Sequence, residues 1–416
     1  MKYKAYGITL VLIIFFQSAC GDSNSQKEAK QKTTLISKSK DEKQELVSIS
    51  DTLKSKEKVL SDASFPIIIL GMSNTDKAFK QVREWGVTHV QRYGMGRLIE
   101  NDQSFFDRAE KFGFNVMSDL RARYWLKKKK DNDRFKKYLE HFKEHPAMGF
   151  WYLSDEPDNK GIKPNELKPL YELIKEETPN VPVANAHAWS KNWYKYDEVQ
   201  DILMYDYYPV WGEPFPENKL DAWTNFTESA AKRNKADGNL VMPILQIFSW
   251  QAFTKKNQKR YQNYSVEELR YPNTDELRYM IFSSLAQGAK GIALFSYGRA
   301  HMVNPEWGDK ILAPVLREAK EFAGGVNNMK MQGVKSATDV NILLSNWSND
   351  TAAFLILANT SPKERKVSIK VEETAIGSLD AYKPWGQTRK SVNVSLSGAK
   401  LSIDTIKPWE IIILKK

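Results

Sequence analysis

The stretch AMGFWYLSDEPD (147–158) delivers two adjacent carboxyl groups to the end of an apolar run. Its first part is mostly apolar, which is typical of a strand buried on both faces. Asp155 and Glu156 follow, and the proline after them cannot donate to a sheet ladder, so strand pairing must stop there. Carboxyl groups at a strand tip can give and take protons where parallel α/β barrels keep their chemistry. A helix N-cap at Asp158 or Asn159 is the alternative, but capping does not require Asp155 and Glu156 as well.

The chain around this stretch alternates between strand-like and helix-like segments. The predicted strands are 65–72, 88–93, 114–120, 147–153, 181–188, 201–207, 240–248 and 291–297. The predicted helices are 76–85, 103–112, 133–145, 164–177, 220–235, 274–288 and 314–322. Such alternation implies a parallel sheet, and about eight repeats over 65–325 predict a (β/α)8 TIM-type barrel. A doubly wound open sheet is the alternative, but GMSNTDK after the first strand is a poor phosphate-binding turn.

The ends of the predicted strands carry polar, acidic and aromatic side chains that a barrel would gather on one face. The candidates for substrate contact are Arg92, Tyr93, Asp119, Asn185, His187, Trp189, Tyr207, Trp211, Gln246, Trp250 and Tyr297. Aromatic rings at such a face stack on the apolar faces of sugars, and polar neighbours hydrogen-bond to sugar hydroxyls. Plain core packing is the alternative for any single tryptophan.

A second kind of pattern follows Gly324 and Gly325. Short strand-like segments are separated by turns rich in Asn, Ser, Gly and Pro, without a convincing helix between them. These segments are 340–344, 352–358, 366–371, 378–382, 392–396 and 411–414. The pattern predicts a small C-terminal antiparallel β-sandwich over 330–416.

The N-terminal region carries the signals of an exported protein. Lys2 and Lys4 precede an apolar run, 7–16, that is too short to span a bilayer. Small residues then precede Cys20, a pattern that resembles a bacterial lipoprotein signal (1–19) with lipid on the Cys20 thiol. An ordinary cleaved secretion signal is the alternative. Residues 20–64 lack aromatics and predict a disordered tether, so we expect a protein anchored by lipid to the cell envelope, with the outer membrane as the expected site.

Bulk properties exclude several classes of partner. The single cysteine rules out disulfides and cysteine-based metal sites. The net charge is +11, but basic and acidic residues are mixed along the chain, which argues against nucleic-acid binding. The sequence of residues 141–145, HFKEH, matches the pattern of inverted zinc peptidases. The motif would lie in the last turn of a helix, at the barrel end opposite the carboxylates, so we expect no metal and no cofactor.

Three segments carry a resemblance to a known group of enzymes. HPAMGFWYLSDEP, MYDYYPV and LAQGAKGIALFSYG resemble the fourth, sixth and eighth strand segments of barrel glycoside hydrolases, the broad group of β-galactosidases, β-glycanases and hexosaminidases with a paired Asp-Glu. The resemblance implies hydrolysis of O-glycosidic bonds in an oligo- or polysaccharide, with Glu156 as the acid. The seventh strand end, Leu245 to Phe248, lacks the glutamate that many retaining relatives carry there.

The second carboxylate is therefore open. Asp206, after the apolar run that ends the sixth strand, is the first candidate, and Asp119 is the second unless Arg121 and Arg123 hold it as an ion pair. By resemblance, Asp155 could instead orient a substrate acetamide that acts as the nucleophile, with Tyr207 or Tyr297 in support. The rival from another class is a non-catalytic, carbohydrate-binding surface lipoprotein. Carboxyl groups about 5–5.5 Å apart would indicate a retaining pair, and about 6.5–9.5 Å an inverting pair.

Overall fold

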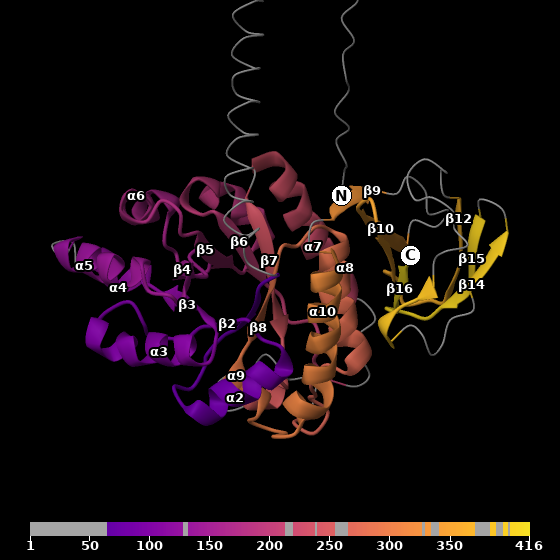
Figure 1. Cartoon of the computed structure of the whole chain (residues 1–416), viewed down its shortest axis with the longest axis horizontal. Helices are drawn as coiled ribbons and strands as arrows, with labels where there is room; N and C mark the ends of the chain where they lie inside the picture. Colours follow the sequence, from indigo (N-terminus) through magenta and orange to yellow (C-terminus); the bar gives the residue numbers. More distant parts are fainter. Residues whose placement is uncertain are drawn as a thin grey trace, which may run out of the picture. The chain divides into compact units, whose positions relative to one another are not determined.

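The structure is a computed structural model that describes residues 65–127, 132–212, 219–237, 239–253, 265–326, 329–333, 341–370, 383–387, 394–397 and 400–416 (Figure 1). The predicted signal and tether, residues 1–64, lie outside these ranges, as does the predicted strand 378–382. Over the described part of the chain, none of the helices has the length and apolar character needed to cross a membrane.

Eight parallel strands close into a barrel in sequence order, which confirms the predicted fold class (Figure 1). The strands are β1 (Ile67–Ile69), β2 (His89–Val90), β3 (Asn115–Asp119), β4 (Met148–Asp155), β5 (Val183–His187), β6 (Ile202–Asp206), β7 (Leu240–Gln246) and β8 (Ile292–Phe295). β1 pairs with both β2 and β8, so the sheet has no free edge. All strands run in the same direction, and their carboxyl ends therefore meet at one mouth.

Helical segments follow the strands and cover the barrel from outside. The helices are α2 (Asp76–Trp85), α3 (Ile99–Lys111), α4 (Ala122–Lys127), α5 (Asn132–Lys143), α6 (Pro164–Glu177), α7 (Lys219–Asp237), α8 (Thr274–Ala286), α9 (Tyr297–Ala300) and α10 (Ala313–Val326). The connection after β5 is a 3-10 segment, η1 (Ser190–Val199), and shorter segments are η2 (Trp250–Phe253) and η4 (Gly308–Leu312). Local chemistry sets their ends: the Thr75 side chain caps α2, and Gly86, at φ 93°, ends it in the left-handed conformation.

The barrel interior is a packed core whose side chains alternate along each strand. The inward-facing set includes Ile68, Met117, Phe150, Tyr152, Ala184, Ala186, Ile202, Met204, Met242, Ile244 and Ala293. Residues between these positions face the surrounding helices. This alternation decides which residues at the strand ends reach the mouth.

The C-terminal domain is a two-sheet β-sandwich, as the sequence predicts. One sheet has the order β13 (Lys383–Pro384), β16 (Ile411–Lys415), β11 (Ala353–Asn359), β10 (Ile342–Ser348), β9 (Lys330–Gly333). The other has the order β12 (Arg365–Lys370), β15 (Lys400–Ile406), β14 (Val394–Ser397). Leu355, Leu357, Leu401 and Ile403 belong to one buried cluster between the sheets.

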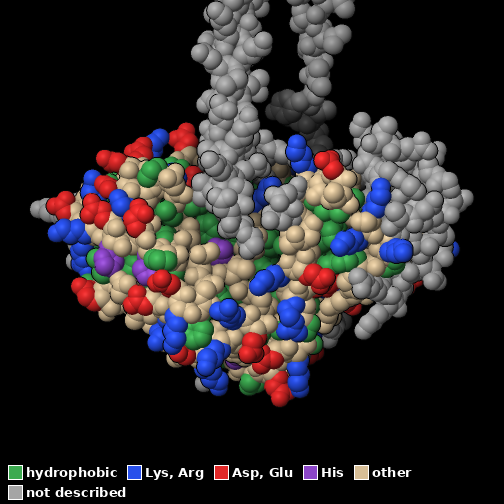
Figure 2. All heavy atoms as spheres, viewed as in Figure 1, with side chains coloured by type: hydrophobic (Ala, Val, Ile, Leu, Met, Phe, Trp, Pro, Cys, Tyr) green, Lys and Arg blue, Asp and Glu red, His purple; other side chains and the backbone are tan. Residues whose placement is uncertain are grey.

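The outer face of the larger sheet packs on the barrel helices. Phe322 of α10 contacts the rings of Phe354 and Trp385 at centroid distances of 5.1 and 5.9 Å. The exterior of the described chain carries basic and acidic side chains interspersed over the face that Figure 2 shows. Neither sign of charge dominates that face.

Candidate active site

A β-bulge in β4 brings the adjacent carboxylates to the barrel mouth. The register between β4 and β5 pairs Tyr152 with Ala184 and Asp155 with Ala186, so one residue of β4 is extra. Both alanines face the lumen, and the bulge therefore turns Tyr152 and Asp155 inward although they are three residues apart. Glu156 follows at φ 44°, a left-handed conformation that is strained for a residue other than glycine. Strain of this kind is concentrated at functional sites.

Asp206 and Glu156 form a pair of carboxyl groups at this mouth. Asp206 pairs in register with Ile244, whose side chain lies in the lumen, so Asp206 also points inward. Burial, the charge of Glu156 and a hydrogen bond between the two carboxyls hold the pKa of Asp206 well above its usual range. The Oδ1 atom of Asp206 is buried, and no N–H or O–H group of the described residues donates to it. Asp206 and Glu156 thus lie close enough for Glu156 to act on the pKa of Asp206.

Asp155 is held by two donors. The Tyr152 hydroxyl donates to its Oδ1 atom at 2.8 Å, and the Lys160 ammonium forms an ion pair with its Oδ2 atom. Lys160 also donates to the Asp155 carbonyl at 2.7 Å. Both oxygens of Asp155 thus have partners, in contrast to Asp206.

Asp119 is the fourth carboxyl group of the mouth. Its Oδ2 and Oδ1 atoms accept hydrogen bonds from the main-chain N–H groups of Gly94 and Arg121, at 3.1 and 3.2 Å. Burial, with the charge of Asp155 adding to it, raises the pKa of Asp119 to about 6. The expected ion pair with Arg121 and Arg123 does not form among the described residues, and Arg121 binds Asp119 through its backbone instead.

Three tyrosines surround these carboxyl groups. Tyr93, Tyr152 and Tyr208 all have a pKa raised well above the usual range, by burial first and then by nearby carboxylate charges. The hydroxyl of Tyr208 donates to Asp206 Oδ2 at 3.4 Å. Tyr93 as a whole residue is 41% exposed, so part of it lies where a ligand can reach it.

Sequence reasoning selected Tyr207 and missed Tyr152 and Tyr208. Tyr207 stacks on Phe226 of α7 at 4.9 Å and 23°, outside the barrel wall. Asp206 and Tyr208 are two residues apart and face the lumen together, whereas Tyr207 faces the helices. Because side chains alternate along a strand, counting two residues on from Asp206 could have identified Tyr208. The bulge that turns Asp155 inward has no comparable signal in the sequence.

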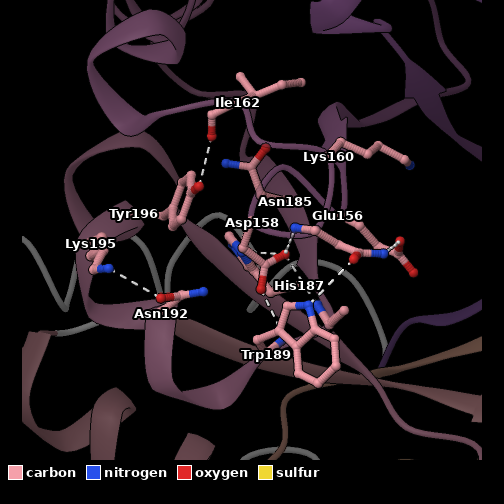
Figure 3. Close-up of polar contacts among 12 residues, drawn as sticks. Glu156, Asp158, Lys160, Ile162, Asn185, His187, Trp189, Asn192, Lys195 and Tyr196 are labelled. Atoms are coloured by element: carbon pink, nitrogen blue, oxygen red, sulfur yellow. Dashed lines mark hydrogen bonds and ion pairs between the residues drawn. The ribbon is translucent and has the colours of Figure 1, made fainter.

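Trp189 and the β4–α6 loop form the rim of the mouth beside Glu156 (Figure 3). Asp158, whose side chain is fully buried, accepts hydrogen bonds from the main-chain N–H groups of Ala188 and Trp189 at 3.2 and 2.8 Å. The alternative of a helix cap at Asp158 or Asn159 is wrong, because α6 starts at Pro164 with Lys163 as its N-cap residue. Trp189 itself is 48% exposed.

The structure places Asn185 and His187 behind the mouth. They occupy outward positions of β5 and alternate with Ala184 and Ala186, which face the lumen. Asn185 donates to the Val199 carbonyl at 2.9 Å, and His187 Nε2 contacts Gln200 Oε1 at 2.8 Å. Burial lowers the pKa of His187. Both residues therefore support the loop that carries Trp189 and do not reach a ligand.

Other predicted contact residues also make structural bonds. Arg92 pairs with Asp102 at 2.9 Å, and the Tyr297 hydroxyl donates to Gln81 at 3.0 Å. Gln246 accepts from the Val210 N–H at 2.9 Å and donates to the Val210 carbonyl at 2.7 Å, which fixes the loop after β6. The side chains of Arg92 and Tyr297 thus point away from the lumen, and that of Gln246 is held by the backbone of the loop after β6.

Trp211 and Trp250 lie at one side of the mouth. Their rings stack at 4.3 Å and 18°, and the ring of Trp250 contacts Tyr208 at 6.3 Å. Trp250 is 7% exposed. The two indoles thus form a wall next to Tyr208, with little free surface on Trp250.

The zinc-peptidase alternative finds no support in the described part of the chain. His141 and His145 contact different residues of α3, Gln103 and Asp107. Among the described residues, no group of three or more His, Cys, Asp and Glu side chains could hold a metal ion.

Comparison with known proteins places the fold. No protein-family model matches the chain, and no curated protein matches it. An α-amylase from Geobacillus thermoleovorans, solved with acarbose, is similar with a TM-score of 0.56 and 9% identity, over 85% of this chain and 98% of the amylase. A maltogenic α-amylase from Thermotoga neapolitana gives 0.54 and 11%, over 85% and 99%, and an Anoxybacillus α-amylase gives 0.52 and 11%, over 84% and 98%. At such identities the likeness concerns the fold.

Proposed function

We propose that this protein is a glycoside hydrolase that cleaves O-glycosidic bonds of an oligo- or polysaccharide. The observation that carries the proposal is the Asp206–Glu156 pair at the barrel mouth, where burial and then Glu156 hold the pKa of Asp206 well above its usual range. Glycosidic cleavage needs one carboxyl group to protonate the leaving oxygen and a second, charged one on the anomeric side. The fold likeness to α-amylases, one of them solved with acarbose, supports a carbohydrate substrate.

The chemistry follows from the raised pKa of Asp206. Before substrate enters, burial favours the proton on Asp206. Transfer of this proton to Glu156 leaves Asp206 as a carboxylate. Glu156 then gives the proton to the leaving oxygen as the glycosidic C–O bond breaks. Asp206 attacks the anomeric carbon or takes a proton from the water that does so.

The two carboxyl groups stand on different supports. Glycosidases hold their pair about 5–5.5 Å or about 6.5–9.5 Å apart. Asp206 projects from a barrel strand, whereas Glu156 stands on the loop that follows β4. We therefore expect Glu156 to turn toward the leaving group when a sugar enters.

The acetamide-assisted mechanism is the weaker version of this proposal. Asp155 would have to face the acetamide, but both of its oxygens already accept from Tyr152 and Lys160. Tyr207 and Tyr297, the residues expected to support an acetamide, contact Phe226 and Gln81 outside the mouth. We favour the Asp206–Glu156 pair for these reasons.

The rival function is carbohydrate binding without catalysis. The main support for this function is that the seventh strand end lacks a glutamate. Asp206 beside Glu156 supplies a second carboxyl group and so weakens that support. A screen of α-glucans, β-glycans and N-acetylhexosamine polymers with wild type and Glu156→Gln separates the two functions. We expect Glu156→Gln to lower turnover by about 10²- to 10⁴-fold, because it cannot donate the proton.

Glu172→Gln is the matched control, since Glu172 is an exposed residue of α6. It should leave turnover unchanged. Tight glycan binding without hydrolysis by wild type would establish the binder and refute the hydrolase.

We further propose that the chain is a lipoprotein anchored through Cys20 to the bacterial outer membrane. The basic start, the apolar run 7–16 and the small residues before Cys20 support this. Cells fed a labelled fatty acid should label wild type but not Cys20→Ala. Export of an unlabelled wild-type protein would contradict the anchor.

A further inference from the structure

Asn159 stands three residues after Glu156 in the loop that leaves β4. Its Nδ2 atom donates a hydrogen bond to Glu156 Oε2 at 2.8 Å. A donated N–H favours the charged form of a carboxyl group and fixes its orientation. Asn159 thus acts on one oxygen of Glu156 and leaves the other available to Asp206 or to a substrate.

The orientation of the Asn159 amide is set from its other side. Trp189 Nε1 lies 3.4 Å from Asn159 Oδ1. An indole N–H can only donate, so the amide oxygen must face Trp189 and the amide NH₂ must face Glu156. A flipped amide would place a carbonyl oxygen against a carboxylate and two N–H groups against each other.

The backbone of Trp189 is fixed while its ring is open. The buried Asp158 carboxylate binds the N–H groups of Ala188 and Trp189, which ties the loop after β5 to the loop after β4. The side chain extends from this anchor with 48% of the residue exposed. An exposed indole beside a catalytic carboxyl group offers an apolar face to a sugar ring while its N–H stays on Asn159.

We propose that Asn159 is a positioning residue for Glu156, and that Trp189 sets the orientation of Asn159 from a sugar-stacking position. This inference rests on the proposed hydrolase function. In the free site Asn159 holds one oxygen of Glu156 and thereby fixes the orientation of this carboxyl group. A sugar that stacks on Trp189 contacts the residue that orients Asn159. Sugar binding at this position is thereby linked to the orientation of Glu156.

The test compares the pH dependence of kcat/KM for wild type, Asn159→Ala, Asn159→Asp and Trp189→Phe. Without the donor, the limb that reports Glu156 should move to higher pH by about half to one unit in Asn159→Ala, and kcat should fall by about three- to tenfold with KM nearly unchanged. Asn159→Asp keeps the shape but adds a negative charge, so its limb should move further. Trp189→Phe keeps a ring but loses the N–H, so it should show a smaller shift in the same direction.

A double variant tests the linkage. Because Trp189 acts through Asn159, Asn159→Ala/Trp189→Phe should show the same pH profile as Asn159→Ala alone. Asn192→Ala is the control, since Asn192 lies in the same η1 segment and accepts only from Lys195 in that loop. It should leave the profile unchanged.

The outcomes separate this inference from the function beneath it. An active wild type whose Asn159 variants keep its pH profile, or a double variant whose shifts add, would overturn the positioning role alone. A wild type that hydrolyses no glycan would overturn the hydrolase proposal and this inference with it. Asn159 is an exposed residue, so its variants should melt at the wild-type temperature and report on the site rather than on folding.

Discussion

Buried charge is treated in opposite ways at the barrel mouth and at the contact between the barrel and the C-terminal domain. At the contact, Arg278 of α8 and Glu318 of α10 form two parallel hydrogen bonds of 2.8 Å, with side chains 5% and 7% exposed. Arg278 also donates to the Ile411 carbonyl, and Glu318 accepts from the Gln387 N–H, both at 3.1 Å. Each of the two charged side chains there has an oppositely charged partner and a hydrogen bond to the backbone of the β-domain.

The mouth holds four carboxyl groups with far less compensation. Among the described residues, the ion pair of Lys160 with Asp155 is the only one that these four groups make. Burial, and then the charges of neighbouring carboxylates, raise the pKa of Asp206 and that of Asp119. The comparison teaches that this fold pairs its buried charges where the two domains meet and leaves like charges together at the barrel mouth, where our proposal requires a proton to move.

The largest effect on stability should come from breaking the paired region. Glu318→Gln leaves the Arg278 guanidinium buried without its counter-charge. We expect a loss of about 3–5 kcal/mol in the free energy of unfolding, measured by urea denaturation. Turnover at temperatures where the variant is folded should stay at the wild-type level.

Replacing both partners sharpens this test. An Arg278→Met/Glu318→Leu variant removes the charges together and should recover most of the loss, since a buried pair is often matched by apolar residues of similar volume. A single variant as stable as wild type would show that the pair contributes nothing to the domain contact.

A smaller effect should appear at Asp119 as a pH dependence. Its pKa is raised to about 6 in the folded protein, above the ordinary value of 3.8, so the folded state binds more protons between these pH values. Asp119 therefore costs stability as the pH rises from about 4 to about 6, by about 3 kcal/mol in total. Asp119→Asn does not titrate, so its stability relative to wild type should increase by that amount between pH 4 and pH 7. A constant difference across this range would show that Asp119 titrates normally.

The sequence predicted the barrel and the β-sandwich well because both depend on periodic patterns. Alternating apolar segments and helices identify eight strands, and the apolar run before Asp155 and before Asp206 places both at strand ends. The side of each strand is harder to predict from the sequence. The direction of Tyr208 follows only once that of Asp206, two residues earlier, is known. Asp155 faces the lumen only because of the β4 bulge.

The sequence also does not predict which side chains hydrogen-bond to residues of other strands and loops. Gln246 hydrogen-bonds to the backbone of Val210. Asn185 hydrogen-bonds to the carbonyl of Val199, and His187 to the side chain of Gln200. Asn159 gave no signal, because its role depends on Glu156 in one direction and on Trp189 in the other. Such roles follow from where loops meet, which the sequence pattern does not give.

The most direct test of the account is one variant, Asp206→Asn, measured for both stability and turnover at pH 7. The raised pKa of Asp206 lets the folded state keep a proton that the unfolded chain loses as the pH rises above about 4, so Asp206 costs stability at pH 7 but not well below pH 4, where it is protonated in both states. Asparagine does not titrate and removes this cost. We predict a gain of about 1 kcal/mol in the free energy of unfolding at pH 7, no such gain at low pH, and turnover lowered by about 10²- to 10⁴-fold. A variant that is less stable than wild type at pH 7 and keeps its turnover would contradict the claim that the mouth carboxylates are held together for chemistry.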